Sequence, residues 1–187
     1  MVTQRGGITL IEFLIALTIA ALLLGVGLHS LTQLVDDSRS RAALNQMVIA
    51  ITLARSSAIS LRQPTLLCPG AGPQCGPRDS WHDGALLFLD ENANGRQDQA
   101  DTLLKRLAGF DQGRLYWRAF RNRTFLRFTP SGYTAAQNGS FTYCRAPNNA
   151  QGARIVILNA QGRTRLGQDS NQDGIVEDGS GRPAVCP

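Results

Sequence analysis

The apolar run ITLIEFLIALTIAALLLGVGL, residues 8–28, constrains this chain more than any other feature. It contains a single charged residue, Glu12. A helix of about 20 apolar residues spans a lipid bilayer, so the run predicts a membrane-inserted helix. A cleavable secretory signal is the alternative, but no evident small-x-small cleavage motif follows the run.

The helical pattern continues beyond the apolar run, because no proline occurs before Pro64 and apolar residues keep recurring at three- and four-residue spacing. One helix is therefore expected from about residue 8 to about residue 62, roughly 80 Å long. Residues 8–28 form its transmembrane half and residues 29–62 an amphipathic half. The positions that continue the apolar pattern are Leu31, Leu34, Val35, Ala42, Met47, Val48, Ile51, Ala54, Ala58 and Ile59.

The residues outside the helix indicate an oxidising compartment. Arg5 on the short N-terminal side predicts that this end stays cytoplasmic and that the rest lies in the periplasm. The four cysteines form no CxxC pair, which argues against zinc and for disulfides. Three pairings are open. Cys68–Cys75 with Cys144–Cys186 is favoured, because the first closes the loop CPGAGPQC and the second ties down the C-terminal tail.

Residues 63–187 change to short β-rich runs between clusters of Gly, Asn, Asp and Pro. FTYC and RIVILN read as one hairpin, and RIVIL and RTRL read as another around the turn NAQG. The expected fold class is α+β, with a long N-terminal α-helix packed against a C-terminal antiparallel β domain.

The start of the chain, RGG-ITLIEFLIAL, resembles the class III signal of type IV prepilins. The resemblance implies a leader peptide of residues 1–7, cleavage by prepilin peptidase between Gly7 and Ile8, and N-methylation of Ile8. It also implies a glutamate at the fifth mature position, which is Glu12. Ile8 departs from the usual phenylalanine, and His29 stands where many major pilins have proline.

A carboxylate within a membrane helix costs about 2.5–3.5 kcal/mol on insertion scales. The prepilin resemblance implies a partner that offsets this cost, namely the N-terminal amine of a neighbouring subunit or of the same chain. Glu12 then serves as an assembly charge. The alternative is a simple membrane anchor with Glu12 near the bilayer interface.

The other end, YCRAPNNAQGARIVILNAQGRTRL with the late Cys186, resembles minor pilins and pseudopilins of the GspH/FimT type. This resemblance implies a type IV pilin-like fold, an inner-membrane location before assembly and a place in the pilus afterwards. The implied partners are other minor and major pilins, with which the subunit starts or caps the fibre. A pseudopilin of a type II secretion system is the alternative.

The segment GRTR resembles the DNA-contacting loop of FimT-type competence pilins. Its candidate DNA-binding residues are Gly162, Arg163 and Arg165. Alternate strand residues share a face, so the two guanidiniums can straddle successive phosphates. The excess of 19 basic over 14 acidic residues also favours an anionic partner. The alternative is that G-R-x-R is a general feature of this pilin type.

A second basic stretch, residues 114–128, interleaves arginines with aromatic residues, as single-strand binding surfaces do. A strand with one core face and one charged face produces the same pattern and is the favoured interpretation.

Two loops match the ligand spacing of calcium-binding EF-hand loops. Gly95 and Gly174 stand at the glycine turns. The candidate ligands are Asp90, Asn92, Asn94, Asp98 and Asp101 in the first loop, and Asp169, Asn171, Asp173 and Glu177 in the second. Asx turns between strands explain the same residues and are favoured.

Enzyme signatures are not evident in the sequence. His82 has Asp79 and Asp83 nearby but no recognisable nucleophile motif, and neither a Walker-type loop nor GxGxxG occurs. The chain is therefore predicted not to be an enzyme, with calcium as the only candidate cofactor.

Overall fold

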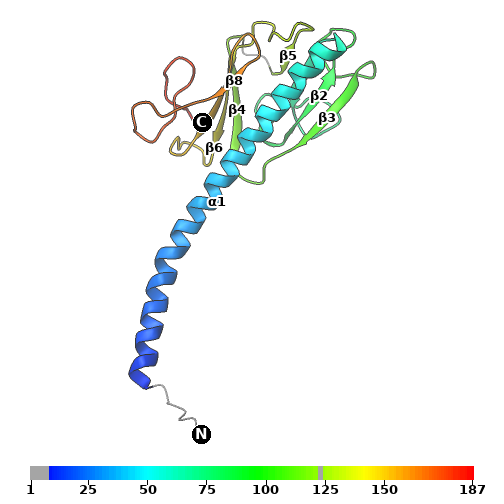
Figure 1. Ribbon diagram of the computed structural model, residues 1–187. Helices are drawn as coiled ribbons and strands as arrows, with labels where there is room; N and C mark the ends of the chain where they lie inside the picture. The colour runs from blue at the N-terminus through cyan, green and yellow to red at the C-terminus, as the bar shows by residue number, and fades with distance from the viewer. Residues whose placement is uncertain (1–8, 122–123) are drawn as a thin grey trace, which may run out of the picture. The chain divides into compact units, whose positions relative to one another are not determined.

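The computed structural model describes residues 9–121 and 124–187, and the side chains of residues 23–30 and 33 are excluded from that description. The expected cleavage site, Gly7 and Ile8, lies outside the described residues. The chain divides into two compact units, one that ends at Ser38 and one that comprises Arg39–Pro187. Figure 1 shows a long helix followed by β-sheets.

Helix α1 (Leu10–Leu61) agrees with the expected helix to within two residues at each end. It ends where Arg62 takes a left-handed conformation, with φ 54°, and Pro64 follows two residues later. A left-handed residue followed by proline is a common way to stop a helix. The Thr65 hydroxyl donates to the Ala54 carbonyl at 2.8 Å, which holds the next strand against the helix.

Within Arg39–Pro187, one side of α1 is buried against the sheets. Its buried apolar side chains are Ala43, Leu44, Met47, Ala50, Ile51, Ala54 and Ala58. Of the positions expected to continue the apolar pattern, Leu31, Leu34 and Val35 are exposed. These three residues precede Arg39, the first residue of the compact unit that holds the core. Ala42 and Ile59 are also exposed.

The domain contains two four-stranded antiparallel sheets. The first has the order β3 (Thr102–Ala108), β2 (Gly84–Leu89), β1 (Thr65–Pro69), β5 (Leu126–Phe128). The second has the order β4 (Arg114–Ala119), β6 (Gly139–Cys144), β7 (Arg154–Leu158), β8 (Thr164–Leu166). A short 3-10 helix, η1 (Ser80–His82), precedes β2. Both predicted hairpins, β6–β7 and β7–β8, are confirmed.

One face of each sheet joins α1 in a single core. At its centre, the ring of Phe141 stacks on Trp117 with centroids 4.4 Å apart and meets Trp81 edge-on at 4.9 Å. Most of the buried apolar side chains of α1 are alanines. Small residues let the helix backbone approach the sheets closely, so large aromatic groups fill the core from the sheet side.

The two disulfides join the favoured pairs, Cys68–Cys75 and Cys144–Cys186. The second fixes the C-terminal tail against the outer face of the second sheet, where Ala184 and Cys186 pack with Ile155. The tail also carries the second Asp-rich loop, so the disulfide anchors one end of that segment.

Candidate assembly helix and DNA-binding surface

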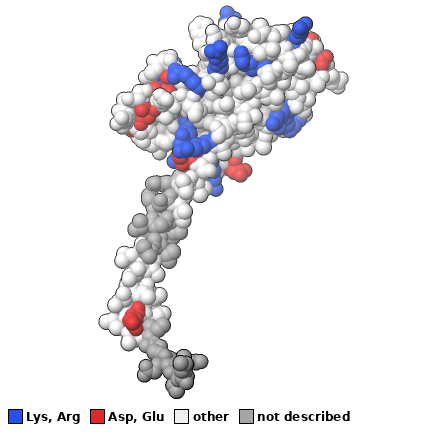
Figure 2. Space-filling model, viewed as in Figure 1, with Lys and Arg blue, Asp and Glu red and all other residues white. Residues whose placement is uncertain are grey.

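The first candidate surface is the helix segment Leu10–Leu22, whose large apolar side chains are exposed. The exposed fraction is 78% for Leu10, 56% for Phe13 and 72% for Leu22. Glu12 is its only charged residue, so the described side chains form a white surface with one red group in Figure 2. A helix that is apolar on every side is stable only when lipid or other helices cover it.

Among the described residues, Leu34–Leu61 is the one helical stretch with the length and composition of a membrane span, and Leu10–Leu22 is a shorter apolar stretch. We assign Leu34–Leu61 to the domain core instead. In its most apolar 18-residue part, 39% is buried. The stretch also carries the charged residues Asp36, Asp37, Arg39, Arg41 and Arg55. Leu10–Leu22, by contrast, has no core of its own to cover its apolar side chains. The first part of α1 therefore fits a single-pass membrane anchor.

Glu12 has a local partner that the sequence interpretation missed. The Thr9 backbone N–H donates to Glu12 Oε2 at 3.0 Å, and the Glu12 backbone N–H donates to Thr9 Oγ1 at 3.3 Å. This reciprocal pair is a capping box, and its T-x-x-E spacing is visible in the sequence. Thr9 thus holds the carboxylate at the start of α1, where it remains exposed.

The turn between β7 and β8 positions the GRTR segment. Gly162 takes φ +75°, and its N–H donates to the Asn159 carbonyl at 3.0 Å. A Cβ at Gly162 would lie 2.7 Å from the Gly132 carbonyl oxygen and 2.8 Å from Arg55 Cδ. Gly162 is buried and fits this turn because it has no side chain. Its role is therefore to shape the loop, whereas the arginines beside it face solvent.

Arg163 and Arg165 are both exposed. Arg165 lies within β8 opposite Ile157, whereas Arg163 precedes the strand, contrary to the expectation that both are strand residues. Hydrogen bonds nevertheless continue the ladder to Arg163, because its carbonyl accepts from the Asn159 N–H at 3.1 Å. The two arginines are two residues apart along an extended segment, so they share the outer face of the second sheet.

The second basic stretch has the favoured arrangement. Along β4, Leu115 and Trp117 are buried in the core, while Arg114 and Arg118 are exposed on the opposite face. Arg123 lies outside the described residues. Most aromatic side chains of the stretch therefore serve packing, while Phe120 is 78% exposed.

The first Asp-rich loop satisfies its carboxylates with its own donors. Buried Asp90 accepts the Gly95 N–H at 3.1 Å and lies 3.6 Å from the Arg127 guanidinium. The Ala100 N–H and the side-chain amides of Asn92 and Asn94 hold the pKa of Asp98 below its ordinary value. Asp101 accepts the backbone N–H groups of Glu91 and Asp98. The candidate ligand side chains thus hydrogen-bond to one another and to backbone N–H groups of the same loop.

The second loop brings three carboxylates together, from Asp169, Asp173 and Glu177, with one oxygen of each within 4.8 Å of the others. Each also accepts a backbone N–H from within the loop. The Asn171 amide donates to Asp173 at 3.0 Å. Calcium binding by either loop stays a prediction. A rise in melting temperature at millimolar calcium supports it, and an unchanged melting temperature removes it.

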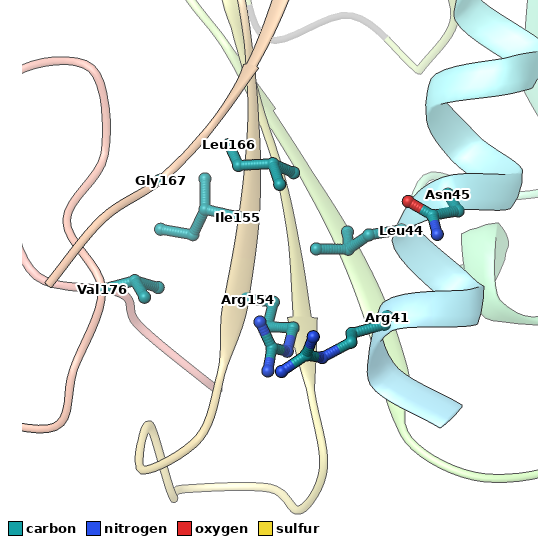
Figure 3. Close-up of a pocket in the computed structure, with 8 residues that line it drawn as sticks. All are labelled: Arg41, Leu44, Asn45, Arg154, Ile155, Leu166, Gly167 and Val176. Atoms are coloured by element: carbon teal, nitrogen blue, oxygen red, sulfur yellow. The ribbon is translucent and has the colours of Figure 1, made fainter. Parts of the chain in front are cut away.

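A cavity of about 260 Å³ lies between α1 and the β7–β8 side of the domain. Figure 3 shows Arg41 and Arg154 extending toward each other beside Leu44, Ile155 and Leu166. The Arg154 Nε–H donates to Ser40 Oγ at 3.1 Å. The described residues that line the cavity include no cysteine, serine, histidine or carboxylate, so this cavity offers no general base or nucleophile.

The long helix and the two antiparallel sheets define a pilin-like protein. The family model described as type II transport protein GspH matches residues 43–162. The chain therefore belongs to the GspH family of minor pilins and pseudopilins.

Two kinds of known protein are similar to the chain. Pilin-like protein PilA1 of Thermus thermophilus is 29% identical over 174 residues, which cover 87% of this chain and 98% of PilA1. The crystal structure of the Pseudomonas aeruginosa type IV minor pilin FimU in space group P21 matches with a TM-score of 0.55 and 21% identity. It covers 70% of this chain and 89% of FimU. At this identity the structural match supports the fold, which agrees with the α+β prediction.

Proposed function

We propose that this chain is a minor type IV pilin that prepilin peptidase cuts between Gly7 and Ile8 and that assembles through its N-terminal helix. The observation that carries the proposal is the exposed apolar surface of Leu10–Leu22 with Glu12 as its one charge. Before assembly, the inner membrane covers this surface, and the C-terminal domain lies in the periplasm. In the fibre, the helices of other minor and major pilins cover it.

Glu12 acts in this proposal as the assembly charge. Cleavage after Gly7 leaves Ile8 as a new N-terminus, and its methylated amine keeps a positive charge. A carboxylate in an apolar bundle is costly unless a partner offsets its charge. The described geometry supports the pairing, because Thr9 holds the Glu12 carboxylate at the beginning of α1 and leaves it exposed.

Mass spectrometry of the chain extracted from membranes tests the processing step. The expected mass is that of residues 8–187 with both disulfides and one added methyl group. A Gly7→Val variant is expected to keep the leader, because the side chain obstructs the peptidase. Wild-type chain that retains residues 1–7 in cells with active prepilin peptidase contradicts the proposal.

The alternative is a minor pseudopilin of a type II secretion system, as the description of the family model suggests. The similarity to a pilin-like protein and the fold shared with a minor pilin support the pilus assignment. Deletion of the gene distinguishes the minor pilin from the secretion pseudopilin. Loss of surface pili with normal secretion supports the pilus role, and loss of secretion with normal pili overturns it.

We also propose that the domain binds DNA during natural transformation through Arg163 and Arg165. The supporting observation is that both guanidinium-bearing side chains are exposed on one face beside a turn that Gly162 locks in place. Contacts of this kind reach phosphates and do not read sequence. Binding is therefore expected to weaken steeply as salt concentration rises.

The test uses the full chain in non-ionic detergent and a fluorescent DNA duplex. Arg163→Gln with Arg165→Gln is expected to weaken binding and to lower the slope of log affinity against log salt by about 2, or about 0.9 for each lost phosphate contact. The control, Arg78→Gln with Arg114→Gln, removes the same charge from two other exposed positions. Equal binding by the two double variants contradicts the assignment of these arginines.

A further inference from the structure

The outer face of the second sheet carries a row of side chains that crosses all four strands. Arg118 of β4 lies opposite Ser140 of β6, and Ser140 lies opposite Ile157 of β7. Ile157 in turn lies opposite Arg165 of β8. Because neighbouring strands are about 4.8 Å apart, the Cα atoms of Arg118 and Arg165 are about 14 Å apart.

A second row of residues on the same face lies two residues farther along each strand, and hydrogen bonds are present at both of its ends. At one end, the Phe120 N–H donates to the Asn138 carbonyl at 2.9 Å. At the other end, Asn159 and Arg163 are joined by two hydrogen bonds. The residues named in the two rows include three exposed arginines and no carboxylate. Ser140 adds a half-buried hydroxyl, which is a further potential donor to a phosphate oxygen.

The C-terminal tail lies over the middle of the row, at Ile157, and over the neighbouring part of this face. Tyr116, two residues before Arg118, donates its hydroxyl to the Pro187 carbonyl at 3.3 Å. A Cβ at Gly179 would lie 3.1 Å from Ile157 Cγ2 and 3.8 Å from Arg165 Nη2, so the tail packs on Ile157, between the two ends of the row. The carboxylate of the adjacent Asp178 pairs with Arg182 at 2.9 Å, which reduces its repulsion of an anion.

We propose that the DNA-binding surface extends from Arg163 and Arg165 across the sheet to Arg118, and that it contacts both backbones of duplex DNA. This inference rests on the proposed DNA-binding function. The 14 Å between the ends of the row is comparable with the roughly 12 Å width of the major groove. Arg163 and Arg165, about 7 Å apart, follow one backbone, while Arg118 reaches the other.

The aromatic residues favour duplex over single-stranded DNA as the partner. Single-strand surfaces use exposed aromatic rings on which successive bases stack. Here Trp117 and Phe128 are buried in the core, and Tyr116 is bonded to the tail. Phe120 is the one aromatic side chain of the described part of residues 114–128 that is mostly exposed. One ring does not form a stacking platform, so the arginines act on the backbone.

The test compares Arg118→Gln with Arg114→Gln in the full chain, in non-ionic detergent. Both arginines are exposed on the outer face of β4, but Arg114 lies opposite Cys144, outside the two rows. Fluorescence anisotropy measures binding to a 20-base-pair duplex and to one of its strands. Arg118→Gln is expected to weaken duplex binding about threefold to tenfold and to lower the salt slope by about 0.9. Its affinity for the single strand is expected to stay within about twofold.

The outcomes separate this inference from the proposed function. If Arg163→Gln with Arg165→Gln weakens binding and Arg118→Gln behaves like Arg114→Gln, the extension across the sheet is wrong and DNA binding stands. If Arg118→Gln weakens single-strand and duplex binding equally, the contact with a second backbone is wrong. If the wild-type chain does not bind DNA, the function and the extension both fail. Unchanged melting temperatures of the variants establish that each result reports contacts with DNA.

Discussion

The two parts of α1 use apolar residues for different purposes. From Leu10 to Leu22, large residues such as Leu14 and Ile15 are more than half exposed. From Arg39 onward, the buried side includes Ala50, Ala54 and Ala58. Small buried residues allow the sheets to approach the helix, whereas large exposed ones provide a surface for lipid or other subunits. Under the proposed function, fold stability and assembly therefore depend on separate stretches of one helix.

The largest expected effect is a difference in the free energy of unfolding between a variant in each stretch. Ile51→Ala is expected to lower the free energy of unfolding of the domain by about 2–5 kcal/mol, because Ile51 is completely buried. Leu14→Ala is expected to change it by less than about 0.5 kcal/mol, since that side chain is 53% exposed. Tryptophan fluorescence during denaturation measures both, because Trp81 and Trp117 lie in the domain core. Similar losses in the two variants contradict the division.

The next effect concerns the turn that rests on the domain part of α1. Gly162→Ala is expected to destabilise the domain by about 1–3 kcal/mol, because φ is positive there and the added Cβ meets the Gly132 carbonyl. Gly181→Ala is the control, since Gly181 also has positive φ but no atom lies within 4 Å of an added Cβ. A larger loss in Gly181→Ala indicates that the Gly162 turn is not held by its packing.

How much of the molecule follows from the sequence depends on how local each pattern is. The extent of α1, the β6–β7 hairpin and the Cys68–Cys75 pair follow from spacing and turn chemistry within short segments. The buried positions on α1 follow only in part: Met47, Ile51, Ala54 and Ala58 continue the apolar spacing and are buried. Ala43 and Ala50 were not expected, because they are buried only where the folded sheets meet the helix. The row from Arg118 to Arg165 depends on the register of strands distant in sequence. The capping box of Thr9 and Glu12 was visible as T-x-x-E.

A smaller effect on stability is expected at Asp178 of the C-terminal tail. This carboxylate belongs to the folded domain, whereas Glu12 belongs to the exposed stretch of α1. Burial raises the pKa of Asp178, but the N–H groups of Ser180 and Arg182 and the Arg182 guanidinium together lower it below its ordinary value of 3.8. The folded state therefore gains stability from ionised Asp178 above pH 3.8, and loses it as the pH falls through the lowered pKa.

Asp178→Asn is accordingly expected to cost about 0.5–1.5 kcal/mol at pH 7. The difference from wild type should shrink as the pH falls below about 4. Denaturation curves at pH 7 and pH 2.5 measure it. A difference that stays constant with pH shows that the ionised carboxylate is not the stabilising group.

The most direct measurement of the central claim is the amount of Glu12→Ala chain recovered in sheared pili, beside a Thr9→Ala control. Thr9→Ala removes the hydroxyl of the capping box but keeps the Glu12 carboxylate. If Glu12 is the assembly charge, Glu12→Ala is processed normally but largely absent from fibres, while Thr9→Ala is incorporated. Normal incorporation of processed Glu12→Ala, or equal losses in the two variants, contradicts that role.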